Sequence, residues 1–140
     1  MAADSAHRSV TVERTGNGRF TAANPRGGRI TVAADGADFT PTELLLAAIG
    51  GCTAIDVDIL TSRRAEPERF EVQVDADKVR DTGGNHLTGI SVTFRIAFPS
   101  GEQGDRAQAV LPHVVKRSHD WLCTVGRTVE IGTPITTRIG

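Results

Sequence analysis

The sequence predicts an α+β domain in which antiparallel sheets surround one long central helix. The segment from Thr40 to Arg64 is apolar on every side over most of its length, which is typical of a helix inside a core. Stretches before and after this segment alternate polar and apolar residues, as half-buried strands do. Strands and helices cluster along the chain instead of alternating, and this order favours antiparallel sheets.

The start of the central helix is marked by a capping box. Thr40 and Glu43 have the spacing of this motif, and Pro41 between them suits the first helical position. Arg63 and Arg64 follow at the other end, where positive charge suits the negative end of the helix dipole. We therefore expect the helix to run from about residue 40 to residue 64.

Two glycines lie in the middle of this helix. No charged residue occurs from Leu44 to Ile55, and Gly50 and Gly51 directly precede Cys52. Each glycine costs a helix about 1 kcal/mol relative to alanine. We expect them to allow backbone or a ligand to approach the helix where it presents a thiol.

The remaining elements follow from alternation and from turn residues. Before the helix we predict three short strands, separated by glycine-containing turns at 15–18 and 24–28; they are Ser9–Glu13, Arg19–Ala23 and Arg29–Ala33. After it we predict two long strands, one from Phe70 towards Arg80 and one over Ile90–Phe98. Two helices follow, from about Asp105 to Ser118 and from Trp121 to Glu130, and the chain closes with a strand over Thr133–Ile139. Residues 1–7 read as a loose tail. The 140 residues contain no repeat or linker, so we expect one domain over 1–140.

Composition excludes several classes of partner. Hydrophobic residues make up 39% of the chain, charged residues 24%, and the net charge is −1. This balance gives no basis for binding nucleic acid or an anionic membrane surface. The longest apolar run is too short for a membrane span, and the N-terminus lacks the apolar region of a secretory signal. We expect a cytoplasmic protein.

Two cysteines are the main candidates for chemistry. Cys52 and Cys123 are separated by 71 residues, so any partnership between them is tertiary. A permanent disulfide is unusual in the cytoplasm, which leaves inert core residues or a redox or nucleophilic pair. Cys123 falls in the first turn of the predicted last helix, where the helix dipole would lower its pKa.

Other polar residues offer weaker alternatives. His119 precedes Cys123 by four residues, so the two would share a helix face and could form a nucleophile with its base; a capping role for this histidine is as compatible with the pattern. Asp56 would destabilise a thiolate at Cys52, and Asp56 or Asp58 could pair with a basic residue of a partner subunit. The cysteine and histidine spacing fits no zinc site, and no phosphate-binding loop is present.

Two segments together resemble a known family. The sequence PTELLLAAIGGCTAIDV, followed later by SHDWLCTVGRTVEIGTPI, resembles the OsmC/Ohr family of osmotically inducible and organic-hydroperoxide-resistance proteins, and GGCTAIDV is most similar to its OsmC-like branch. The resemblance implies an intertwined homodimer with active sites at the interface. It also implies a thiol-dependent peroxidase that reduces organic hydroperoxides with an external thiol or dithiol reductant, without metal, flavin or nucleotide cofactor.

The resemblance also implies roles for individual residues. Cys52 would be the peroxidatic cysteine, and Cys123 would resolve its sulfenic acid as a disulfide. Glu43 falls on the position of a glutamate that pairs with an arginine from the N-terminal strands. For that arginine we favour Arg19, which begins a strand after the Asn-Gly turn; the alternatives are Arg14 and Arg26.

Two other functions stay open on the sequence. A small-molecule or acyl-chain binding protein could use the same apolar dimer pocket, with the thiols only lining it. A hydrolase could use Cys52 or Cys123 together with His119.

Overall fold

The computed structural model describes residues 5–140 of the chain. It divides into two compact units, Met1–Leu45 and Leu46–Gly140. The single domain expected over 1–140 therefore stays a prediction. Part of the predicted N-terminal tail, residues 1–4, lies outside the described residues.

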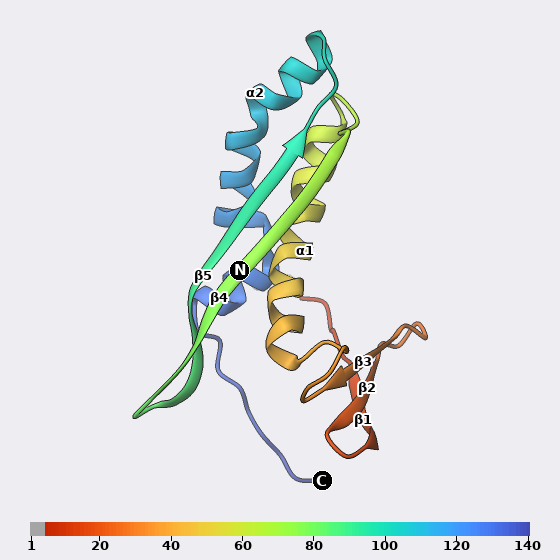
Figure 1. Cartoon of the computed structure of the whole chain (residues 1–140), viewed down its shortest axis with the longest axis vertical. Helices are drawn as coiled ribbons and strands as arrows, with labels where there is room; N and C mark the ends of the chain where they lie inside the picture. The colour runs from red at the N-terminus through yellow and green to blue at the C-terminus, as the bar shows by residue number, and fades with distance from the viewer. Residues whose placement is uncertain (1–4) are drawn as a thin grey trace. The chain divides into compact units, whose positions relative to one another are not determined.

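The first unit contains a three-stranded antiparallel sheet. Its strands are β1 (Thr11–Gly16), β2 (Arg19–Ala23) and β3 (Arg29–Ala33), in the order β1-β2-β3 (Figure 1). The predicted bounds of the second and third strands are confirmed. The first strand was predicted over Ser9–Glu13, but it begins at Thr11 and continues to Gly16, because pairing with β2 extends it up to the turn.

Both predicted turns of this sheet are present. Gly18 has a φ of 67°, a left-handed conformation that glycine adopts without strain. In the second turn the side chain of Asn24 accepts hydrogen bonds from the backbone amides of Arg26 and Gly28, both at 2.9 Å. These bonds fix the reversal between β2 and β3.

The central helix α1 runs over Pro41–Ser62. The predicted capping box is confirmed, because the Thr40 amide donates to Glu43 Oε1 at 2.9 Å and the Glu43 amide donates to Thr40 Oγ1 at 3.4 Å. The helix ends two residues before the predicted Arg64. Arg64 nevertheless supports this end, since its guanidinium donates to the carbonyl of Leu60 at 3.1 Å.

In the second unit a long hairpin follows α1. It is formed by β4 (Arg69–Asp81) and β5 (Gly84–Ala97), both longer than predicted, and a bulge lies between Asp75 and Asp77. Alternate positions place apolar side chains on one face of the hairpin, and the other face is polar. The apolar face carries the pairs Phe70–Ile96, Val72–Phe94 and Val74–Val92.

The C-terminal part differs from the prediction in two ways. Helix α2 (Glu102–Arg117) is followed by a π-helical turn, η1 (Ser118–Leu122), and by α3 (Thr124–Glu130), so the single helix predicted from Trp121 is divided at Cys123. The closing strand predicted over Thr133–Ile139 is wrong. Among the described residues no strand pairs with this segment, and Ile139 is fully exposed.

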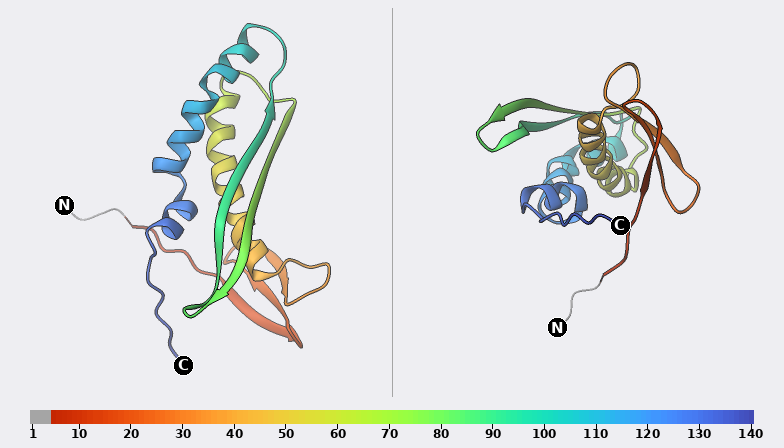
Figure 2. Two further views of the ribbon diagram at one scale, coloured as in Figure 1. Left: turned by 60° about the vertical axis from the view of Figure 1, so that its left-hand side comes forward. Right: turned by 90° about the horizontal axis from the view of Figure 1, so that it is seen from below.

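The core of the second unit lies between α1, the hairpin and α2. Both helices lie on one side of the hairpin (Figures 1 and 2). Val57 of α1 is fully buried, as is Ala107 of α2. Gly50 allows the helix to approach β4, because a Cβ at this position would lie 2.8 Å from Cγ2 of Val74. The close approach expected at the glycines therefore occurs at Gly50, but the neighbour is a side chain of β4 and neither backbone nor a ligand.

One face of α1 is left uncovered by its own chain. Ile55 is 62% exposed and Ile59 is 51% exposed, and Gly51 has no neighbour within 4 Å of its would-be Cβ. By length and composition alone, α1 is long and apolar enough to cross a membrane. The sequence predicted no membrane span, because its longest apolar run is too short for one. Core helices of water-soluble proteins meet the same criterion of length and composition. Because α1 packs against β4 through Gly50, we interpret it as a core helix.

The two adjacent glycines should respond in opposite ways to alanine. Gly50→Ala should lower the free energy of unfolding by about 1–3 kcal/mol, because the new Cβ would lie 2.8 Å from Cγ2 of the β-branched Val74 and something must shift. Gly51→Ala adds a methyl group in open space and should raise it by up to about 1 kcal/mol through helix propensity. Urea unfolding of both variants measures the difference. Equal effects would contradict the packing of α1 on β4.

Candidate active site

The two cysteines meet in the second unit although they are distant in sequence. Cys52 lies in the middle of α1 and is half-buried. Cys123 lies between η1 and α3 and is only 4% exposed. Both are free thiols, and the Cys52 thiol is close enough to act on the ionisation of Cys123. The two thiols are therefore neighbours in the fold, and their partnership as a redox pair stays a prediction.

The environment of Cys123 keeps it protonated. Burial raises the pKa of the Cys123 thiol, and the Cys52 thiol and the Asp56 carboxylate raise it further. The backbone amide of Gly126 donates to its sulfur at 3.3 Å and offsets part of this effect. The lowered pKa predicted for Cys123 is therefore wrong. This residue caps a helix of only seven residues, and desolvation outweighs what the helix end supplies.

Buried hydroxyl groups connect the elements that carry the thiols. Thr53 Oγ1 lies 2.7 Å from Ser118 Oγ, and Ser118 Oγ donates to Asp56 Oδ2 at 2.9 Å. Sequence reasoning missed Thr53 and Ser118. The available signal was a threonine and an aspartate on an otherwise apolar helix, since buried polar groups require partners.

An apolar cavity of about 450 Å³ lies beside Cys123. Side chains from α1, β5, α2 and α3 form its walls, together with Thr53, His119 and Glu130. The apolar walls are Ile49, Ile90, Val92, Phe94, Val115 and Val129. Such a cavity suits an uncharged organic group, with few polar groups available to orient it.

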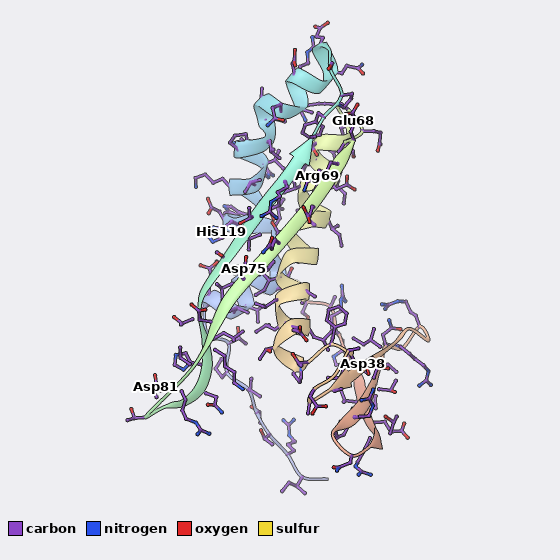
Figure 3. The ribbon with its side chains drawn as sticks, viewed as in Figure 1. Asp38, Glu68, Arg69, Asp75, Asp81 and His119 are labelled. Atoms are coloured by element: carbon purple, nitrogen blue, oxygen red, sulfur yellow. The ribbon has the colours of Figure 1, made fainter. Side chains whose placement is uncertain are left out.

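His119, which Figure 3 labels, lines the same cavity, and two carboxylates hold its ring. Its Nδ1 lies 3.0 Å from Asp120 Oδ1, and its Nε2 lies 2.9 Å from Glu130 Oε1. The hydrogen bond to Asp120 and the charge of Glu130 raise the pKa of His119. Since η1 ends at Leu122, His119 and Cys123 do not share the helix face on which a nucleophile and base were expected.

Arg19 and Glu43 belong to the first unit. Arg19 forms an ion pair with Asp38, and Glu43 closes the cap of α1, where the Thr40 amide lowers the pKa of the Glu43 carboxyl group. Their action on Cys52, and the choice of Arg19 over Arg14 and Arg26, stay predictions. Within residues 5–140 no three histidine, cysteine or acidic side chains gather as metal ligands.

The contacts of His119 predict a pH-dependent contribution to stability. A histidine with a raised pKa in the folded state stabilises fully below its unfolded pKa of about 6.5, and this contribution disappears as pH rises through the folded value. His119→Gln should therefore lower the free energy of unfolding more at pH about 5.5 than at pH about 8.5. Urea unfolding across this range measures the effect. Glu130→Gln should remove part of the same pH dependence, and a constant difference between His119→Gln and wild type would contradict the ion pair.

Comparison with solved structures identifies the fold. An OsmC-like protein of unknown function from Vibrio cholerae superposes with a TM-score of 0.74 at 16% identity, covering 90% of this chain and 95% of that one. A hypothetical protein from Aquifex aeolicus superposes with a TM-score of 0.73 at 24% identity, covering 92% and 91%. OhrB of Bacillus subtilis, an organic hydroperoxide resistance protein, superposes with a TM-score of 0.53 at 17% identity, covering 87% and 90%. The predicted α+β class with antiparallel sheets is confirmed.

Sequence comparison agrees with the fold. An uncharacterised protein of Mycobacterium tuberculosis is 31% identical over 126 residues, which cover 89% of this chain and 90% of the relative. The family model described as OsmC-like protein matches residues 34–138, a range that includes both cysteines. The resemblance noted in the sequence is therefore confirmed, and the chain belongs to the OsmC-like protein family.

Proposed function

We propose that this protein is a thiol-dependent peroxidase that reduces organic hydroperoxides through Cys52 and Cys123. One observation carries the proposal: two free thiols are neighbours in the fold, and one of them, Cys123, lines an apolar cavity. The family connects this arrangement with peroxide chemistry through such members as OhrB, whose name refers to organic hydroperoxide resistance.

The proposed reaction has two steps. The Cys52 thiolate attacks the distal oxygen of the hydroperoxide, so the O–O bond breaks, Cys52 becomes a sulfenic acid and the alkoxide takes a proton to leave as an alcohol. The Cys123 sulfur then attacks the Cys52 sulfur, an S–S bond replaces the S–O bond, and the hydroxyl leaves with the Cys123 proton as water. An external thiol or dithiol returns the disulfide to two thiols.

The assignment of the two roles follows from their surroundings. The raised pKa of Cys123 keeps it as a thiol at neutral pH, so it is poorly suited to attack a peroxide first. Cys52 is half-buried and more accessible than Cys123. We therefore assign Cys52 as the peroxidatic and Cys123 as the resolving residue.

Arg19 and Glu43 complete the proposed site. A guanidinium can stabilise a thiolate and hydrogen-bond a peroxide oxygen, and a carboxylate can hold the guanidinium in place. We assign these roles to Arg19 and Glu43. In the first unit Arg19 pairs with Asp38, so its action on Cys52 would require it to exchange or share that carboxylate.

We further propose that the protein works as a cytoplasmic homodimer. The exposed Ile55 and Ile59 give α1 an apolar face that a second copy would cover. Ile135 is 93% exposed in the extended C-terminal segment, where alternating apolar residues suit pairing with another chain.

The cavity also favours a second candidate function, the binding of a small molecule or acyl chain without turnover. Its volume of about 450 Å³ is within the range of ligand pockets, and its walls are mainly aliphatic. In this case the thiols would stay reduced when ligand binds. We do not propose the hydrolase, because both ring nitrogens of His119 face carboxylates that favour its protonated form.

The peroxidase predicts distinct outcomes for the two cysteine variants. Cys52→Ser should abolish consumption of tert-butyl hydroperoxide, because the attacking sulfur is lost. Cys123→Ser should allow one rapid turnover and then accumulate sulfinic acid at Cys52. Mass spectrometry after addition of one equivalent of hydroperoxide measures both, and the wild type should lose two hydrogens. The fluorescence of Trp121, the one tryptophan, offers a kinetic readout two residues from Cys123.

Two results would separate the candidate functions. Undiminished turnover in Cys52→Ser would exclude the proposed mechanism. Thiols that stay reduced under hydroperoxide, together with stoichiometric binding of a fatty acid, would instead support the binding protein.

The dimer predicts that a charge on the exposed face of α1 separates the subunits. Ile59→Lys should shift the protein from dimer to monomer, with little loss of monomer stability, because Ile59 is 51% exposed within its own chain. Gln103→Lys adds the same charge at an exposed position of α2 and should leave the dimer intact. Sedimentation velocity at micromolar concentration measures both, and a monomeric wild type would contradict the proposal.

A further inference from the structure

Three polar side chains of the second unit form a chain of two hydrogen bonds that runs from the buried Thr53 and Ser118 to the half-buried Asp56. Thr53 is 6% exposed and Ser118 is fully buried. Ser118 Oγ donates its single proton to Asp56 Oδ2, so the hydroxyl of Thr53 donates to Ser118 Oγ. The order of donation is thereby fixed, from Thr53 through Ser118 to Asp56.

This group holds the segments on both sides of the cysteine pair. Thr53 directly follows Cys52 on α1, and Asp56 lies one helical turn beyond it. Ser118 also binds the other cysteine, because its backbone carbonyl accepts the amide of Cys123 at 2.8 Å. A hydrogen-bonded path from the turn of α1 that carries Cys52 to the backbone of Cys123 therefore runs through Ser118.

The π-helical turn sets the direction of Cys123. In an α-helix the carbonyl of Ser118 would accept the amide of Leu122, four residues later. The π turn instead closes on Cys123, five residues later, and Cys123 leaves it with extended backbone angles of −75° and 95°. One residue of helix corresponds to a rotation of about 100°, so this choice decides which way the thiol points.

We propose that Thr53, Asp56 and Ser118 are positioning residues that hold Cys52 and Cys123 at the separation needed to form their disulfide. The inference rests on the proposed peroxidase and adds to it the residues that favour the resolving step. That step forms the S–S bond and releases water from the sulfenic hydroxyl and the Cys123 proton, and an organic hydroperoxide supplies the oxidising equivalents. The three residues take no part in bond making or breaking.

The first test measures how strongly the protein favours its own disulfide. Wild type and variants are equilibrated with reduced and oxidised dithiothreitol at fixed ratios, and the fraction of disulfide gives the effective concentration of one thiol at the other. Ser118→Ala and Thr53→Val each remove a hydroxyl and leave buried partners unsatisfied. Each should lower this effective concentration about tenfold, which corresponds to about 30 mV in the reduction potential.

Three further variants separate positioning from general loss of stability. Thr61→Val removes another fully buried hydroxyl of α1, one that bonds only the carbonyl of Val57 at 2.8 Å. It should leave the effective concentration unchanged even if the protein unfolds more easily. Asp56→Asn keeps an oxygen that accepts the Ser118 hydroxyl and should stay near wild type, whereas Asp56→Ala should match Ser118→Ala.

The second test measures the competition that follows peroxide reduction. With excess tert-butyl hydroperoxide, Cys52 sulfenic acid either forms the disulfide or is oxidised again to sulfinic acid. Ser118→Ala and Thr53→Val should shift the products towards sulfinic acid by about tenfold, and Thr61→Val should not. The rate at which sulfenic acid first forms should stay unchanged in Ser118→Ala and Thr61→Val, which lie outside the wall of the cavity. Mass spectrometry of the intact protein distinguishes the products.

The outcomes distinguish the two proposals. A wild type that forms a disulfide with hydroperoxide, combined with Thr53→Val and Ser118→Ala that match Thr61→Val in both tests, would overturn the positioning role and leave the peroxidase standing. If the wild-type thiols do not react with hydroperoxide, the peroxidase is overturned. If Ser118→Ala and Thr53→Val still differ from the wild type in the dithiothreitol equilibrium, the positioning geometry is supported. If Ser118→Ala does not fold, Thr53→Val and the Asp56 pair decide the question.

Discussion

The close packing of α1 against the β4–β5 hairpin is the constraint on which the second unit depends. Gly50 allows it, since a side chain at this position would collide with Val74. Cys52 and Thr53 belong to the same turn of α1 as Gly50, and they contact the segment that contains Ser118 and Cys123. The turn of α1 that packs against β4 is therefore also the turn that carries the first thiol.

Most of the fold could be predicted because it follows from local patterns. The alternation in β2, β3 and the hairpin and the capping box at Thr40 depend on near neighbours in sequence. The π turn at Ser118 could not be predicted, because the side-chain bonds of Ser118 go to a helix more than 60 residues away. The prediction of a strand over Thr133–Ile139 was wrong for a related reason. Alternation of residues within a segment does not show which neighbouring strand it would pair with.

The candidate site was predictable in its chemistry and less so in its electrostatics. The sequence identified both thiols, but the direction of the pKa shift at Cys123 was wrong, because burial depends on tertiary packing. The hydroxyls of Thr53 and Ser118 were missed because either residue type is common at helix ends and surfaces. Only the assembled core makes them interior partners of Asp56.

The protonated state of Cys123 has a chemical consequence beyond catalysis. A neutral, buried thiol reacts slowly with alkylating agents, soft metal ions and low-molecular-weight disulfides, all of which prefer an accessible thiolate. Of the two cysteine thiols, only the half-buried Cys52 is therefore accessible to electrophiles from solution. The buried Cys123 thiol instead meets an electrophile that forms inside the protein, the proposed sulfenic acid of Cys52. Its selectivity then comes from its position in the fold and not from its intrinsic reactivity.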